Sequence, residues 1–133
     1  MNRRQVLALI AALPFAAQAA RAATAAVYTP EAVQAELAAG KTVVLDFSAD
    51  WCPSCQSQGR TIAKLRDENP GWADTMAFFV VDWDTYKNSD LAKKYGVISR
   101  GVLVVLKGDA VVAQTTNHTT KDALKAMFDQ ASA

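Results

Sequence analysis

The order of hydrophobic and polar residues along the chain predicts alternating helices and strands from about residue 30 onward. Short, apolar, β-branched runs predict strands at 42–47, 76–81, 102–106 and 110–114. Lys107-Gly108-Asp109 separates the last two runs and predicts a hairpin turn. Helical patterns with start or stop residues are expected at 30–39, 53–69, 88–95 and from about 119 onward. This order indicates a single α/β domain.

The first 22 residues differ in composition from the rest of the chain. Arg3 and Arg4 precede an almost wholly apolar stretch at 6–17, and small residues follow up to Ala19 and Ala22. This is the pattern of a secretory signal, and the apolar stretch is short of the ~20 residues that span a bilayer. We expect cleavage after Ala19 or Ala22, with a retained anchor as the alternative. The paired arginines fit either the Sec or the twin-arginine export route.

The chain therefore divides into a cleaved signal peptide at 1–22, a small-residue linker at 23–29 and one folded domain at 30–133. Its formal net charge is +1, but the first 22 residues hold three arginines and no acid. The remainder has 11 basic against 13 acidic side chains, a net charge of −2. A basic stripe for nucleic acid is not expected. Because 51% of the residues are hydrophobic, one packed core forms without help from a metal.

Cys52 and Cys55 are the only cysteines, and export would place them in an oxidising compartment such as the periplasm. A disulfide between residues three apart closes a very small loop and adds little stability, so exchange chemistry explains the pair better than a structural staple. Cys52 comes where a predicted strand leads into a predicted helix, and Cys55 follows one turn later. The helix dipole at that point stabilises a thiolate.

The segment 44–55, with the sequence Val-Leu-Asp-Phe-Ser-Ala-Asp-Trp-Cys-Pro-Ser-Cys, resembles the strand and active-site segment of the thioredoxin family. Its Ala-Asp-Trp-Cys part is especially similar to periplasmic thiol-disulfide interchange proteins. Residues 94–97 and 103–109 resemble the family's third helix and hairpin. The resemblance covers roughly residues 30–131. It implies a thioredoxin fold, with a central mixed sheet of about four strands flanked by helices on both faces.

The resemblance implies a role for three residues. Cys52 would be the nucleophile, Cys55 the resolving thiol, and Asp46 the buried carboxylate that assists proton transfer at Cys55. Burial in a strand would raise the pKa of Asp46, which suits a proton acceptor near neutral pH. The alternative for Asp46 is a structural carboxylate hydrogen-bonded at a strand end.

Five neighbouring residues complete the predicted site. Trp51 resembles the family tryptophan beside the dithiol, although a surface-capping aromatic is an equal alternative. Pro53 fits the first turn of a helix, and with Ser54 it leaves no histidine between the cysteines, which favours a reductant. Gly101 stands where the family has a cis-proline, so the Arg100–Gly101 bond is expected to be trans. Arg100 would then favour the Cys52 thiolate, or else be a solvated surface arginine.

These features predict an exported thiol:disulfide oxidoreductase that exchanges with protein thiols and disulfides, more as a reductant than as an oxidant. A membrane protein is a candidate electron donor, and no small-molecule cofactor, metal or nucleic acid is expected. Two alternatives remain: a thioredoxin-fold protein that binds Cu(I) through the two thiols, since the proline shield is missing, and a non-catalytic interaction module. His118 is expected in a surface loop, and Asp82 and Asp84 are expected to be solvated.

Overall fold

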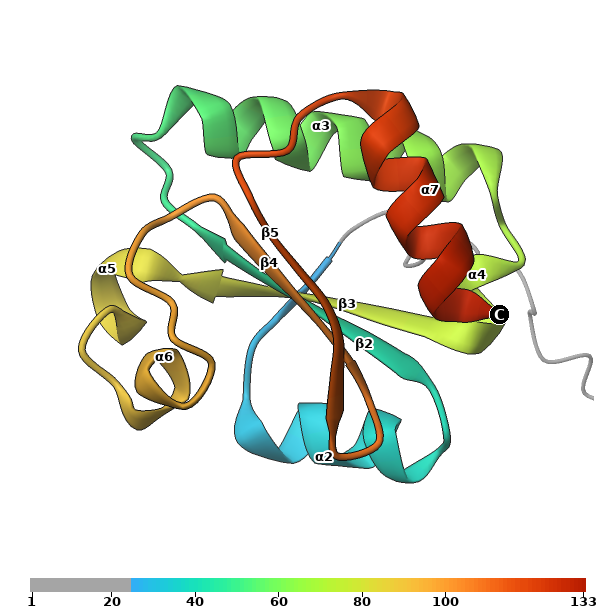
Figure 1. Ribbon diagram of the computed structural model, residues 1–133, viewed down its shortest axis with the longest axis horizontal. Helices are drawn as coiled ribbons and strands as arrows, with labels where there is room; N and C mark the ends of the chain where they lie inside the picture. The colour runs from blue at the N-terminus through green and yellow to red at the C-terminus, as the bar shows by residue number, and fades with distance from the viewer. Residues whose placement is uncertain (1–24) are drawn as a thin grey trace, which may run out of the picture.

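The computed structural model describes residues 25–133, in which helices and strands alternate (Figure 1). The signal-peptide prediction falls on residues outside this range. The strands are β1 (Ala26–Val27), β2 (Thr42–Ser48), β3 (Met76–Asp82), β4 (Val102–Lys107) and β5 (Ala110–Thr116). The helices are α2 (Pro30–Ala38), α3 (Pro53–Glu68), α4 (Trp72–Thr75), α5 (Trp83–Tyr86), α6 (Asp90–Lys94) and α7 (Lys121–Ser132).

The strands form one mixed sheet in the order β1-β3-β2-β4-β5. Strand β3 runs parallel to β1 and β2, whereas β4 runs antiparallel to β2 and pairs with β5 as the predicted hairpin. Strand β2 is thus central, and six of its seven residues are buried. Its carboxyl end leads directly to the cysteines.

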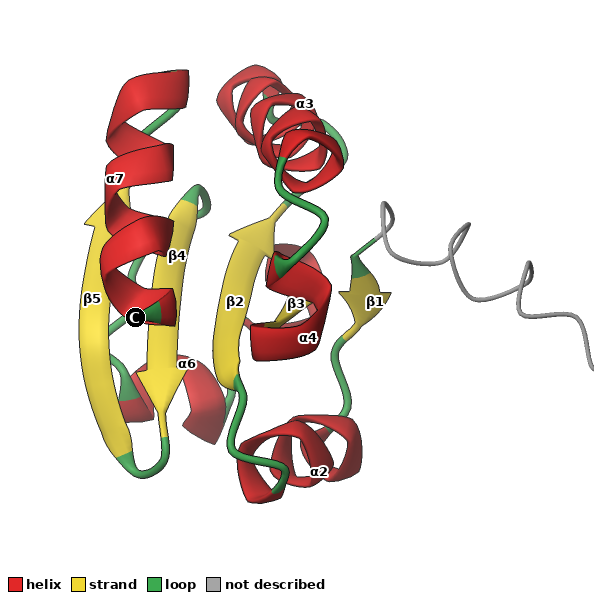
Figure 2. Cartoon of the chain, turned by 90° about the vertical axis from the view of Figure 1, so that its right-hand side faces the viewer, coloured by secondary structure: helices red, strands yellow, loops and turns green. Residues whose placement is uncertain are grey.

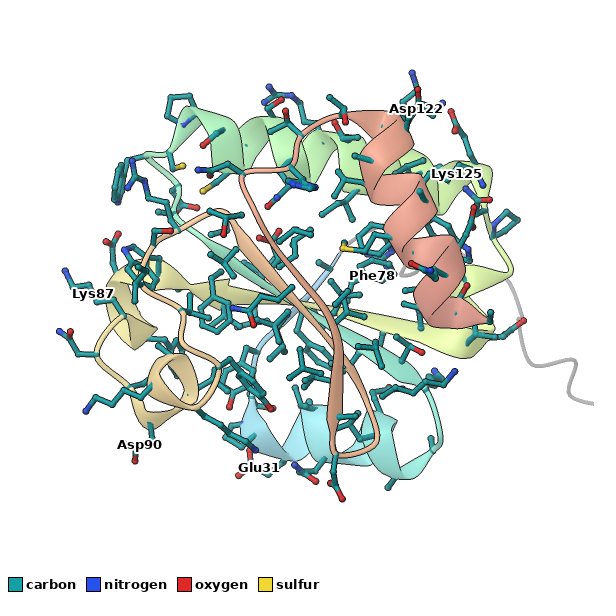
Figure 3. All side chains as sticks on the ribbon, viewed as in Figure 1. Glu31, Phe78, Lys87, Asp90, Asp122 and Lys125 are labelled. Atoms are coloured by element: carbon teal, nitrogen blue, oxygen red, sulfur yellow. The ribbon has the colours of Figure 1, made fainter. Side chains whose placement is uncertain are left out.

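Helices cover both faces of the sheet, with α3 and α7 on one face and α2 and α6 on the other (Figure 2). Because successive residues of a strand point to opposite faces, β2 sends Val44 towards α3 and α7, and Val43 and Leu45 towards α2 and α6. In Figure 3, Phe78 lies in the layer beneath α7, where its ring meets Phe128 edge to face with the ring centroids 5.3 Å apart.

Residues 23–29 were expected to be a linker, and this expectation is wrong for part of the segment. Ala26 and Val27 pair in parallel with Phe79 and Val80, so the sheet has five strands rather than about four. The segment carries no apolar run because its strand is two residues long and lies at an exposed edge, where both residues face solvent. Composition alone therefore gave no strand signal there.

The short helices α4 and α5 were also not predicted. Each has four residues, too few for a helical repeat to show in the sequence. Trp72 at the start of α4 is buried. Among the described residues, no helix combines the length and apolar character that a membrane crossing requires.

Candidate active site at the start of helix α3

Cys52 is the N-cap of α3, at the point where the chain leaves β2. Its Sγ accepts a hydrogen bond from the backbone N–H of Cys55 at 3.3 Å, and it lies 3.3 Å from Oγ of Ser54. Pro53 is the first helical residue, a position where no amide hydrogen is needed. Both cysteines carry free thiols and are 1% exposed. The predicted strand-to-helix placement of the dithiol is confirmed.

The surroundings of Cys52 favour its thiolate. Burial opposes ionisation, but hydrogen bonds from the Cys55 side chain, from Ser54 and from the Cys55 amide, together with a polar contact from Arg100, outweigh it. They lower the pKa of Cys52 from 9.0 to about 7. About half of the Cys52 side chains are therefore thiolates at neutral pH.

Cys55 has the opposite bias. Burial, followed by its hydrogen bond to Cys52, raises the pKa of the Cys55 thiol. At neutral pH one sulfur is ready to attack a disulfide and the other keeps its proton until a base removes it. The two thiols thus differ in the way that a nucleophile and a resolving thiol must differ.

Asp46 lies in the middle of β2, opposite Val80 on one side and Leu103 on the other. It shares the parity of Val44, so its side chain faces α3. The residue is 9% exposed, and its Oδ1 has no hydrogen-bond partner among the described residues. Burial, and then the charge of Cys52, raise the pKa of Asp46 to about 7. The alternative of a carboxylate hydrogen-bonded at a strand end is wrong.

A cavity of about 240 Å³ lies between α3 and the sheet, with Asp46 in its wall. Gly59, Ala63 and Arg66 of α3 also line it. A side chain at Gly59 would meet nothing within 4 Å, so no close backbone approach depends on this glycine. The cavity has room for several water molecules, which are the partners that a buried carboxyl requires.

Trp51 is 58% exposed, in agreement with a surface-capping aromatic rather than one packed on the dithiol. Its indole N–H donates to Oδ2 of Asp84 at 2.8 Å. The guanidinium of Arg100 lies over its ring, with Cζ 4.7 Å from the ring centroid. The aromatic that does pack against Ala49 and the cysteines is Trp83. No signal in the sequence pointed to this contact, since Trp83 lies between two aspartates that were expected to be solvated.

The backbone at Gly101 has a shape that proline cannot adopt. Its φ is +78°, and its N–H donates to the carbonyl of Phe47 at 2.7 Å, whereas proline fixes φ near −65° and has no N–H. No peptide bond between described residues is cis, so the expected trans bond from Arg100 to Gly101 is confirmed. The side chain of Asn117 occupies the space beside the Gly101 Cα.

Gln58, which sequence reasoning missed, ties this loop to the dithiol helix. It is fully buried on α3, one turn after Cys55, and its Nε2 donates to the carbonyls of Gly101 at 3.4 Å and His118 at 2.9 Å. The spacing of three residues from Cys55 was the available signal, since it places Gln58 on the same inward face. Asn117, also missed, is the residue type that best tolerates a positive φ after glycine.

The other polar candidates serve the fold. His118 is an exposed loop residue, as expected. Asp82 caps α5 by accepting from the N–H of Thr85 at 3.3 Å, and Asp84 holds the Trp51 indole. Within residues 25–133 there is no cluster of three or more histidine, cysteine or carboxylate side chains suited to a metal.

Comparison with known proteins agrees with this geometry. The family model described as Thioredoxin matches residues 24–130. Thioredoxin from Bacillus subtilis (strain 168) is 31% identical over 102 residues, which are 77% of this chain and 92% of that protein. Thioredoxin from Chlorobaculum thiosulfatiphilum is 29% identical over 90 residues, 68% of this chain and 79% of that protein. Among solved structures, Trxlp from Edwardsiella tarda EIB202 superposes with a TM-score of 0.70 at 26% identity, covering 79% of this chain and 98% of that one.

Proposed function

Because this chain belongs to the thioredoxin family and is a thiol-disulfide oxidoreductase, we propose that it acts after export, as a reductant of protein disulfides. The observation that best supports this proposal is the difference between the two thiols: the pKa of Cys52 is about 7, whereas the pKa of Cys55 is raised. Reduction by such a pair needs one thiolate that attacks the substrate disulfide and one protonated thiol that resolves the mixed disulfide.

In the proposed reaction, the Cys52 thiolate attacks one sulfur of a substrate disulfide, and the other substrate sulfur leaves as a thiolate that takes a proton from solvent. Asp46 accepts the proton of Cys55. The Cys55 thiolate then attacks Cys52 of the mixed disulfide and releases the second substrate sulfur as a thiolate, which takes up a proton as Asp46 gives up the one that it accepted. The substrate gains two electrons and two protons, and the protein is left with a Cys52–Cys55 disulfide.

Two observations support the reducing direction. The pKa of Cys52 is lowered only to about 7, so the dithiol form is not strongly stabilised and its disulfide is not a strong oxidant. Pro53 and Ser54 also add no positive charge between the cysteines. Each cycle then requires a thiol donor to reduce the Cys52–Cys55 disulfide again, and in an exported protein a membrane dithiol protein is the candidate.

The export proposal rests on residues 1–22, with their paired arginines, apolar stretch and small residues. Mass spectrometry of the protein recovered from a Gram-negative periplasm tests it. A mature N-terminus at Ala20 or Ala23 is expected, and an intact Met1 in the cytoplasmic fraction would overturn it. Replacing both Arg3 and Arg4 by lysine distinguishes the routes, because only twin-arginine export requires the arginine pair.

The reduction potential of the Cys52–Cys55 pair, measured with turnover of a protein disulfide, tests the reductant role. A potential in the range of reducing thioredoxins, near −270 mV, with turnover is expected. Repeating the titration with Cu(I) tests the alternative suggested by the missing proline. If the thiols do not turn over a disulfide but bind Cu(I) tightly, the function is metal binding and the proposal is wrong.

A further inference from the structure

Asn117 occupies a distinctive place in the loop between β5 and α7. It is an exposed residue with a φ of +56°, and its backbone N–H donates to the carbonyl of Gly101 at 2.8 Å. Its side chain lies directly over Gly101, with Oδ1 in the space that a Cβ of residue 101 would occupy. The carboxamide makes no hydrogen bond to any other side chain or backbone group in residues 25–133.

The backbone of Gly101, in contrast, is already used within the protein. Its N–H is bonded to Phe47, and its carbonyl accepts from both Asn117 N and Gln58 Nε2. Gly101 therefore has no strong donor or acceptor left for an incoming polypeptide. Gln58 also binds the carbonyl of His118, so the loops at 101 and 118 are both fixed to α3. The carboxamide of Asn117 is thus a free polar group held on a rigid support.

This carboxamide is linked to the dithiol through Gly101. Gly101 follows Arg100, whose side chain contacts Cys52 and helps to lower its pKa. The Gly101 carbonyl is in turn held by Gln58, one turn of α3 after Cys55. We expect a polypeptide with a disulfide sulfur on Cys52 to lie over this edge.

We propose that the Asn117 carboxamide is a substrate-binding group that hydrogen-bonds the backbone of the polypeptide whose disulfide Cys52 attacks. A carboxamide has the donors and acceptor of a peptide group, so it pairs with a peptide in either direction. It would bind the substrate backbone at this edge, where the N–H and carbonyl of Gly101 are already hydrogen-bonded within the protein. This inference rests on the proposed function, because it assigns a contact to a protein substrate. A small disulfide without a peptide backbone would not make the contact.

The test compares a peptide disulfide with a small disulfide such as 2-hydroxyethyl disulfide. Asn117→Gly is the main variant because glycine accepts a φ of +56° without strain, and Asn117→Asp keeps the shape but loses the N–H donors. Gln34→Ala, which removes an exposed carboxamide on α2, is the matched control. For Asn117→Gly, KM for the peptide should rise about five- to tenfold, as expected for one or two lost hydrogen bonds. The ratio of kcat/KM for the peptide disulfide to kcat/KM for the small disulfide should therefore fall by the same factor. Gln34→Ala should leave this ratio at its wild-type value.

Two results would overturn this inference. One is an unchanged ratio in Asn117→Gly. The other is an equal loss on both disulfides together with a shifted titration of Cys52, which would mean that Asn117 acts through the dithiol. Failure of the proposed function looks different, because the wild-type protein would then turn over neither disulfide.

Discussion

Arg100 lies over the indole ring of Trp51, with its Cζ 4.7 Å from the ring centroid, and the same indole donates to Asp84. The arginine is therefore held at the surface of the site rather than extended into solvent. From this position its side chain also helps to lower the pKa of Cys52. The sequence alone left open whether Arg100 was a solvated surface residue, and the stacking on Trp51 is what places it at the dithiol.

Replacing Arg100 by alanine should raise the pKa of Cys52. Arg100 makes the smallest of the favourable contributions, so the thiolate fraction at pH 7 should fall about twofold, whereas Ser54→Ala should have a larger effect. The rate of alkylation by iodoacetamide between pH 5 and 9 measures the titration. Arg60→Ala, on the exposed side of α3, is the control. If the titration of Arg100→Ala coincides with that of the wild type, Arg100 does not affect the pKa of Cys52.

Asp46→Asn should stabilise the reduced protein at high pH. The pKa of Asp46 is 3.8 when unfolded and about 7 when folded, so the folded state binds more protons between these values. Unfolding free energy in the wild type therefore falls as pH rises from about 4 to 7, by about 4 kcal/mol in total. The neutral amide does not titrate, so the variant should gain about this amount above pH 7 and nothing below pH 4.

Urea unfolding of the reduced wild type and Asp46→Asn at pH 3.5 and pH 8 measures this difference. Cys52 titrates near the same pH and its thiolate raises the pKa of Asp46, so the comparison is repeated in a Cys52→Ser background. An advantage of equal size at both pH values would show that the effect arises from packing and not from the charge of Asp46.

Cys55→Ser should stop the reaction at its first step. With Cys52 intact and no resolving thiol, the protein should accumulate as a mixed disulfide with its substrate, visible as an adduct by mass spectrometry. Cys52→Ser should form no such adduct at neutral pH, because the raised pKa of Cys55 leaves its thiol protonated. Equal yields of adduct in the two variants would show that Cys55 attacks substrate as readily as Cys52, which would contradict the assigned roles.

Much of the fold followed from local sequence patterns. The apolar runs predicted β2, β3, β4 and β5, and the start and stop residues predicted α2, α3, α6 and α7, with bounds within two residues of those observed. These elements bury continuous apolar faces, and burial of this kind leaves a periodic pattern in the sequence. The dithiol and Asp46 lay within such elements, at a strand and a strand-to-helix junction, so their positions were also predictable.

The rest of the site depends on contacts between distant segments. Gln58 bonds to carbonyls 43 and 60 residues away, and no local pattern encodes such partners. Trp83 reaches the cysteines through α5, a helix too short to be recognised. The pairing of Gly101 with Asn117 arises only when the loops before β4 and after β5 meet. The absence of proline was visible in the sequence, but the side chain that compensates for it was not.

Gly101→Ala should destabilise the protein more than a positive φ alone explains. Alanine at a φ of +78° is strained, and its Cβ would also overlap Oδ1 of Asn117. Gly108→Ala is the matched control, because Gly108 has a φ of +60° with open space around it. We expect a loss of about 1 kcal/mol for Gly108→Ala and about 2–3 kcal/mol for Gly101→Ala in urea unfolding.

Adding Asn117→Gly to Gly101→Ala should restore the part of the loss that comes from the overlap, since the two side chains then no longer compete for one space. Equal losses for the two single alanine variants, or a double variant no more stable than Gly101→Ala, would show that Asn117 yields freely and does not fix the edge beside the dithiol.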